Sequence, residues 1–393
     1  MVMLGAKVIA KQNLLFVLLV VLAGILISLM WRNDLNDDTV AYFHEDVPFR
    51  QAADFTEQHL TGFNQVAYSL KSHQSNGVTE PEFLKKVDRF VEWLQDQPEV
   101  VQVSSYVNIH KRLSKNLHSD NDAYYIIPDD RELSAQYLFL YELSLPFGLD
   151  LNNQIDIDKS SLLIRVRAMN DKAKGLIALD ERALGWLNDN MPELATHGAS
   201  VALMFAHIGI RNIDSMIIGS LVALALVTLT LMVALRSVKY GLISIIPNAF
   251  PAAMAFGVWA LVDGEVNLAV AVIFAITLGI VVDDTVHFIH KYMLGVRELQ
   301  LSPEKSVLYA FQHVGNALTT TTVVLAAGFF VLATSSFDVN VVLGFLVAIT
   351  IVIALIWDLL FLPILLMKID SFSARGSKSV PADKLSASVP GNY

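Results

Sequence analysis

Two adjacent carboxylates and a nearby histidine are the residues of this sequence best suited to proton chemistry. Asp283 and Asp284 lie inside a long apolar stretch, and His287 follows them within one helical turn. A charged side chain in a lipid-embedded helix costs roughly 2.5–3.5 kcal/mol on insertion scales, so it usually serves a function. Adjacent carboxylates at low dielectric do not both ionise easily, so the pair can load and release a proton. We predict an intramembrane titratable pair; the structural alternative is that the aspartates mark a helix end and bond to backbone.

Other polar residues in the apolar segments could support this pair. Asp358 lies 10 residues before Lys368, so it could reach the cytoplasmic interface, with either a structural role or one in proton transfer. The hydroxyls of Thr319 to Thr322 could bond to the aspartates or to carbonyls of their own helix. We therefore keep His287, Thr319, Thr320 and Asp358 as predicted supporting residues.

The apolar stretches that carry these residues are long enough to cross a membrane. The chain is 54% hydrophobic and only 17% charged, and its apolar residues are concentrated in separate blocks. A bilayer core needs about 20 apolar residues in a helix. We predict six spans, at residues 14–31, 213–235, 240–262, 268–289, 318–335 and 341–367. The first lacks a small-residue cleavage site, so we interpret it as an uncleaved signal anchor.

The distribution of Lys and Arg predicts the orientation of these spans. Outside the polar region 32–211 there are 11 such residues, and none follows span three or span five. By the positive-inside rule, both termini are cytoplasmic and the polar domain is extracytoplasmic. The predicted organisation is an N-terminus and first span (1–31), a porter-like periplasmic domain (32–211), five more spans (212–367) and a cytoplasmic tail (368–393). The predicted location is the cell inner membrane.

The linker between spans four and five has an amphipathic pattern. Ser302 is a plausible N-cap and Pro303 occupies the first helical position. Apolar residues recur on one face from Val307 to Val314. We therefore predict a separate amphipathic helix at about 302–317 that lies along the membrane surface.

The polar domain shows alternating strand patterns around two amphipathic helices. Predicted strands include Val66–Leu70, Val101–Val103, Leu162–Ala168 and Val201–Phe205, in the order βαβ, an insertion, then βαβ. This order predicts an α+β, ferredoxin-like fold. With 17 basic and 27 acidic residues, the domain carries the whole net charge of −10, which argues against nucleic acid as a partner. The chain has no cysteine and therefore no thiol chemistry.

Several motifs resemble those of one transporter superfamily. The stretch Gly279–Phe288, which contains the Asp pair, is similar to the fourth-helix motif of the resistance-nodulation-division (RND) superfamily. It is most similar to the MMPL-type branch of predicted lipid exporters, which is related to sterol-sensing-domain proteins. Residues 246–251, 317–321 and 357–363 resemble the signatures of the third, fifth and sixth spans. One span, a large outer domain and five more spans form the repeat unit of this superfamily.

The resemblance implies export driven by the proton-motive force, with Asp283 and Asp284 as relay residues and a hydrophobic or lipid-like substrate. Family permeases usually carry two repeats, whereas this chain holds one, which suggests a half-size protein or a separated second half. We therefore expect a homodimer, or a heterodimer with a second RND half, in the lipid bilayer.

The other function classes are an enzyme and a subunit that does not transport. The sequence has no GxxxxGK[ST] phosphate loop, HExxH zinc motif or GxSxG elbow, so we predict neither an enzyme nor a cofactor. A lipid-sensing or accessory membrane subunit could use the same fold without transporting anything. Dependence of substrate movement on the proton gradient would separate these possibilities.

Overall fold

The chain folds into two compact units. The computed structural model describes residues 1–146, 149–169 and 172–377. One unit joins Met1–Leu35 to the residues from Ile213 onward, and the other is Asn36–Asn212. We call the first the helical bundle and the second the polar domain.

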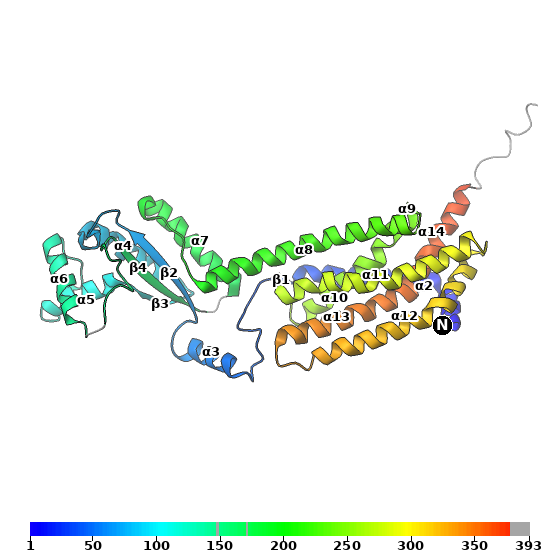
Figure 1. Cartoon of the computed structure of the whole chain (residues 1–393), viewed down its shortest axis with the longest axis horizontal. Helices are drawn as coiled ribbons and strands as arrows, with labels where there is room; N and C mark the ends of the chain where they lie inside the picture. The colour runs from blue at the N-terminus through cyan, green and yellow to red at the C-terminus, as the bar shows by residue number, and fades with distance from the viewer. Residues whose placement is uncertain (147–148, 170–171, 378–393) are drawn as a thin grey trace, which may run out of the picture. The chain divides into compact units, whose positions relative to one another are not determined.

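Long apolar helices make up the bundle (Figure 1). Its elements are α1 (Val2–Ala10), α2 (Gln12–Leu29), the 3₁₀ turn η1 (Met30–Arg32), β1 (Asp34–Leu35), α8 (Val201–Ala234, which begins in the polar domain), α9 (Val238–Ile243), α10 (Ile245–Val262), β5 (Glu265–Val266), α11 (Leu268–Arg297), α12 (Pro303–Leu332), α13 (Asp338–Ile356), the π-helical turn η5 (Trp357–Phe361) and α14 (Leu362–Ser377). Among the described residues, six helical stretches are long and apolar enough to cross a membrane. The predicted multi-pass arrangement is therefore confirmed.

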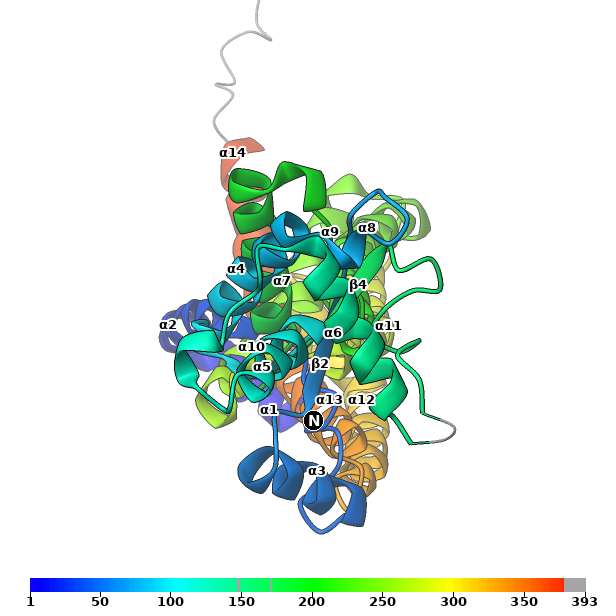
Figure 2. The same cartoon turned by 90° about the vertical axis from the view of Figure 1, so that its left-hand side faces the viewer.

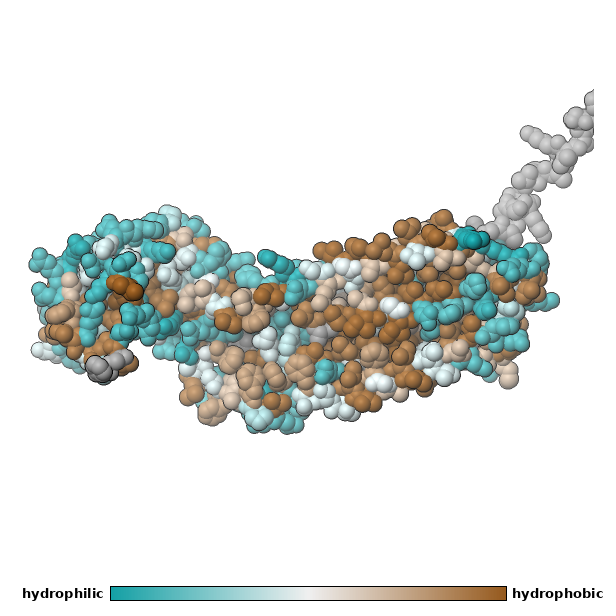
Figure 3. Space-filling view, viewed as in Figure 1, coloured by the Kyte–Doolittle hydropathy of each residue, from teal (hydrophilic) through white to brown (hydrophobic). Residues whose placement is uncertain are grey.

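Close backbone contact holds the first span to the third. A Cβ built on Gly257 of α10 would lie 1.9 Å from the carbonyl oxygen of Leu26, so only glycine lets these helices approach so closely. Beyond η1, the short parallel strands β1 and β5 pair Asp34 with Glu265. On the face drawn in Figure 3, apolar side chains gather over the bundle helices.

The predicted surface helix at 302–317 is wrong as a separate element. The hydroxyl of Ser302 does cap the helix by accepting the Lys305 N–H, but the helix runs without a break from Pro303 to Leu332. Its apolar face, including Val307, Phe311 and Val314, is buried against other bundle helices, not left for lipid. With a good cap and no breaker, these residues extend the fifth span.

The polar domain is built around an antiparallel sheet (Figure 2). Its elements are α3 (Pro48–His59), β2 (Asn64–Lys71), η2 (Gly77–Thr79), α4 (Pro81–Gln95), β3 (Val100–Ser104), α5 (Tyr106–Leu117), η3 (Asp122–Tyr124), α6 (Arg131–Ser144), β4 (Ser161–Ala168), α7 (Lys172–Asn190) and η4 (Pro192–Leu194). In the described part of the domain the strand order is β2-β4-β3, and Tyr68 pairs with Ile164.

Helices α4 and α7 bury one face of this sheet. Tyr68 of β2 lies edge-on to Phe90 of α4, with ring centroids 5.5 Å apart. Trp93 of α4 stacks on Trp186 of α7 at the same centroid separation. These rings belong to one continuous core with the inward-facing residues of β2 and β4.

The fourth strand expected at Val201–Phe205 is wrong. These residues begin α8, where the Ser200 hydroxyl accepts the Leu203 N–H. Pairing reaches only Ala199, which bonds to Ala67 as an isolated bridge. An alternation of five residues fits both strand and helix, and the long apolar run that follows favours the helix. The described sheet therefore has three strands, and the ferredoxin-like fold is not confirmed.

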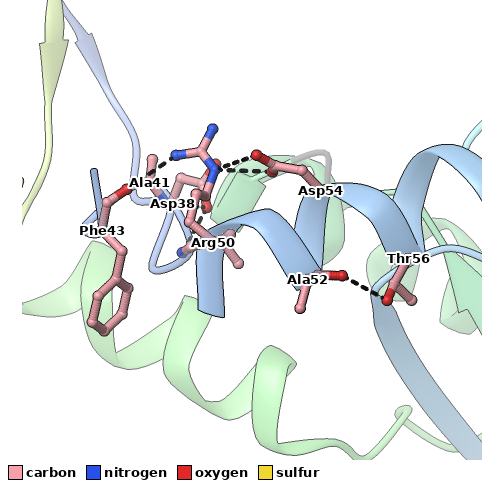
Figure 4. Close-up of polar contacts among 8 residues, drawn as sticks. Asp38, Ala41, Phe43, Arg50, Ala52, Asp54 and Thr56 are labelled. Atoms are coloured by element: carbon pink, nitrogen blue, oxygen red, sulfur yellow. Dashed lines mark hydrogen bonds and ion pairs between the residues drawn. The ribbon is translucent and has the colours of Figure 1, made fainter. Parts of the chain in front are cut away.

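A bidentate ion pair stabilises the start of α3 (Figure 4). The Arg50 Nε donates to both carboxylate oxygens of Asp54 at 2.9 Å, and its Nη1 donates to the Phe43 carbonyl at 3.4 Å. Asp38 accepts the backbone N–H groups of Val40 and Ala41. These bonds order the segment that leads from the first span into the polar domain.

Candidate functional site

Helix α11 positions the predicted carboxylate pair. The Asn267 side chain caps the helix by accepting the Val270 N–H at 3.1 Å, and no proline or internal cap interrupts it before Arg297. Asp283 and Asp284 therefore lie mid-helix, which does not fit the alternative that they mark a helix end. Adjacent residues point about 100° apart around a helix, so the two carboxylates face different surroundings.

Asp284 points toward α12. The Thr322 hydroxyl donates to its Oδ2 at 3.4 Å, and the residue is half-buried. Asp283 lies on the outer side of α11, where its carboxylate is 75% exposed within the single chain. Its Oδ1 lies 3.3 Å from Nε2 of His287, which is 58% exposed. One carboxylate thus belongs to the bundle interior and the other, with its histidine, to the outer surface of the bundle.

Asp358 is the most buried carboxylate among the described residues of the bundle. It lies in the π-helical turn η5 and is 0% exposed. The hydroxyl of Thr285, also 0% exposed, donates to its Oδ1 at 3.0 Å and lies 3.2 Å from Oδ2. The expectation that Asp358 could reach the cytoplasmic interface is wrong, because its side chain faces α11 and not the end of the helix.

Of the run Thr319–Thr322, the structure places only Thr322 against a carboxylate, and it adds Thr285, which was not predicted. Thr319 and Thr320 donate to the carbonyls of Gly315 and Asn316 in their own helix. The contacts to carboxylates come instead from Thr322 and Thr285. Thr285 directly follows the Asp pair in the sequence, and that adjacency is the signal that could have identified it.

Two further polar groups are buried in the same bundle. Asn248 is 1% exposed, and neither atom of its amide has a hydrogen-bond partner among the described residues. The indole Nε1 of Trp357, next to Asp358, also has none among them. Both residues lie in segments that resemble superfamily motifs.

The described site can store and exchange protons. Three carboxyl groups lie on two neighbouring segments, α11 and η5, and hydroxyl groups hold two of them. A hydroxyl can donate to a carboxylate or accept from a carboxylic acid, so these contacts serve both protonation states.

Comparison with known families identifies this region. The model of the MMPL family matches residues 188–380, which include α8 to α14 and every carboxylate of the site. Residues 188–380 are therefore similar to the MMPL family. Together with the six candidate spans, this match confirms the predicted resemblance to the MMPL-type branch of the RND superfamily. No curated protein matches the chain.

Proposed function

We propose that this MMPL-family protein exports a hydrophobic or lipid-like substrate, or moves it within the cell envelope, at the expense of the proton gradient. The single observation that carries the proposal is the fully buried hydrogen bond between Thr285 and Asp358, beside half-buried Asp284, inside an apolar bundle. Buried carboxylates are costly in a membrane, and proton relays are a recognised use of them. Asp283 and Asp284 are the proposed relay residues; Asp358 and His287 support them.

The exposed Asp283–His287 pair favours assembly with a second repeat. The chain alone leaves these polar groups on the outside of α11, within a candidate span. Lipid penalises such exposure, and intramembrane polar residues almost always face a bundle interior or a water-filled cavity. We therefore propose a homodimer, or a heterodimer with another RND half, that covers this face.

We also propose an inner-membrane location with both termini in the cytoplasm and the polar domain in the periplasm. The support is that the Lys and Arg residues near the loops between α8 and α14 all lie at one end of the bundle. Lys239 of α9 and Lys291 and Arg297 of α11, for example, lie toward the ends of these helices opposite β1 and β5.

An accessory or lipid-sensing role is the second candidate. It is favoured by one observation: the relay face of α11 is incomplete within a single chain. In that case the chain would lend its bundle to a partner that performs transport, and its own carboxylates would not need to titrate.

Proton flux in proteoliposomes tests the proposal. The full chain is reconstituted in bacterial polar lipid extract, a pH gradient is imposed, and an internal pH dye is followed. Asp284→Asn keeps the shape but removes the titration, and should lower the flux at least about tenfold, or about 1.4 kcal/mol in activation free energy. Asp338→Asn, at the start of α13, is the matched control. Unaltered flux in the Asp283→Asn/Asp284→Asn double variant would favour the accessory role.

A further inference from the structure

A second largely buried carboxylate lies at the C-terminal end of the last span. Asp370 of α14 has a side chain that is 12% exposed. It accepts hydrogen bonds from the hydroxyls of Tyr292 at 2.7 Å and Tyr240 at 2.9 Å, and from Nζ of Lys239 at 2.5 Å. Tyr292 belongs to α11 and the other two to α9, so one carboxylate joins three helices. We call these four residues the Asp370 clamp.

The clamp surrounds the Asp370 carboxylate with both a positive charge and hydrogen-bond donors. A carboxylate removed from water needs paired charge and hydrogen bonds, and the clamp supplies one ammonium group and two hydroxyls. A second cation supports it, since the Arg297 guanidinium lies 5.7 Å from the Tyr240 ring centroid and donates to the Leu235 carbonyl. Moving α14 away from α9 or α11 at this end would leave the Asp370 charge without its partners.

The clamp joins the same two segments as the carboxylate site. Thr285 and Tyr292 both lie on α11, seven residues or about 10 Å apart along the axis. Their partners, Asp358 and Asp370, both lie on the last span. One contact lets two helices pivot about it, whereas two contacts fix both their shift and their rotation.

We propose that Asp370 is a positioning residue for the intramembrane site. Through Tyr292 it holds α11 in the register at which the Thr285 hydroxyl reaches Asp358. The inference rests on the proposed function only in taking that site as the place of proton transfer. The titratable groups concerned are Lys239, Tyr240 and Tyr292 around Asp370, and Asp284 near Asp358.

Spin-label distances in the full chain test the register. The chain has no cysteine, so Glu298→Cys and Ser371→Cys, both exposed, place labels at the end of α11 and next to Asp370 on α14 without further changes. In lipid nanodiscs the unaltered clamp should give one narrow distance distribution. Asp370→Asn and Tyr292→Phe should each broaden or shift it. Tyr309→Phe removes a hydroxyl of α12 outside the clamp and should leave it unchanged. If Asp370→Asn and a Tyr240→Phe/Tyr292→Phe variant both gave the same distance distribution as the unaltered clamp, the clamp would be overturned.

Infrared titration then tests whether Asp370 influences the protonation of Asp358 or only holds the helices of the bundle together. The carboxyl C=O band of Asp358, assigned by its loss in Asp358→Asn, is followed against pH. Asp370→Asn and Tyr292→Phe should move its midpoint by at least about half a pH unit, whereas Tyr309→Phe should not. A changed spin-label distance with an unmoved midpoint would refute the positioning role. Neither readout needs a substrate, so failure of the transport proposal would not change either result.

Discussion

The Thr285 hydroxyl donates to the Asp358 carboxylate at 3.0 Å, and both side chains are fully buried. This bond joins two residues 73 positions apart and links the motif of the fourth span to that of the sixth. A buried carboxylate without a hydrogen-bond donor lowers the stability of the folded state. The Thr285 hydroxyl therefore offsets part of the cost of burying Asp358.

Removing this hydroxyl should therefore destabilise the bundle. Thr285→Val keeps the shape but leaves Asp358 without its donor, and we expect a loss of about 1–3 kcal/mol in unfolding free energy. Thr320→Val is the matched control, since the Thr320 hydroxyl is exposed and bonds to its own helix. Thermal unfolding in one detergent measures both. Equal melting temperatures for the two variants would contradict the assigned role of Thr285.

The contact between spans one and three gives a second prediction. Gly257→Ala places a methyl group against the Leu26 carbonyl, so α2 and α10 must separate. We expect a loss of at least about 2 kcal/mol in unfolding free energy, as for other overpacked sites. Gly219→Ala on α8 meets nothing within 4 Å and should instead gain up to about 1 kcal/mol. The measurement is thermal unfolding; a stabilised Gly257→Ala variant would contradict this packing.

Cysteine labelling tests the proposed orientation. Ser336→Cys lies between the fifth and sixth spans, and Glu298→Cys follows the fourth; both sites are exposed. If basic residues mark the cytoplasmic side, an impermeant maleimide added to sealed cells should modify position 336 and not position 298. Position 298 should react once the cells are opened. The reverse pattern in sealed cells would invert the topology.

Acid should weaken the polar domain through His110. This residue is 0% exposed, and burial lowers its pKa from 6.5 to about 4. Between these values the unfolded chain binds the proton more readily than the folded one. The contribution of neutral His110 is therefore fully present above pH 6.5 and lost as the pH falls to about 4, a loss of about 3 kcal/mol in unfolding free energy.

Urea unfolding followed by tryptophan fluorescence at pH 7 and pH 4.5 measures this loss. His110→Phe cannot be protonated and should reduce the difference between the two pH values. His44→Gln, at a histidine whose side chain is 51% exposed, should retain it. An unchanged pH dependence in His110→Phe would show that other groups cause the acid sensitivity.

The membrane-spanning helices could be predicted because long apolar runs have one stable arrangement in lipid. The boundaries were harder to predict. At α12 the apolar run begins near Leu318, yet the helix begins at Pro303, because the Ser302 cap and a buried apolar face extend it. At Val201–Phe205 a five-residue alternation could not separate a strand from a helix.

The Asp pair could also be found, because its cost in lipid depends on residue type and location alone. The threonines that donate hydrogen bonds to the site could not be predicted. Neighbouring threonines differ by about 100° around a helix, so choosing Thr322 over Thr319 or Thr320 requires the orientation of α12 against α11. The burial of Asp358 depends likewise on which side of the last span faces α11.

The π-helical turn at Trp357–Phe361 determines the direction in which Asp370 points around the last span, relative to Asp358. Asp358 and Asp370 are 12 residues apart, and in an uninterrupted α-helix they would point about 120° away from each other. A π turn absorbs about one residue without advancing the helix, which leaves eleven effective steps and an offset of only about 20°. Both carboxylates therefore face α11, where Thr285 and Tyr292 receive them. Deleting a single residue from this turn would leave eleven α-helical steps and keep that offset, whereas regular α-helix over all twelve residues would rotate Asp370 about 100° away from its partners, even though no contacting side chain had changed.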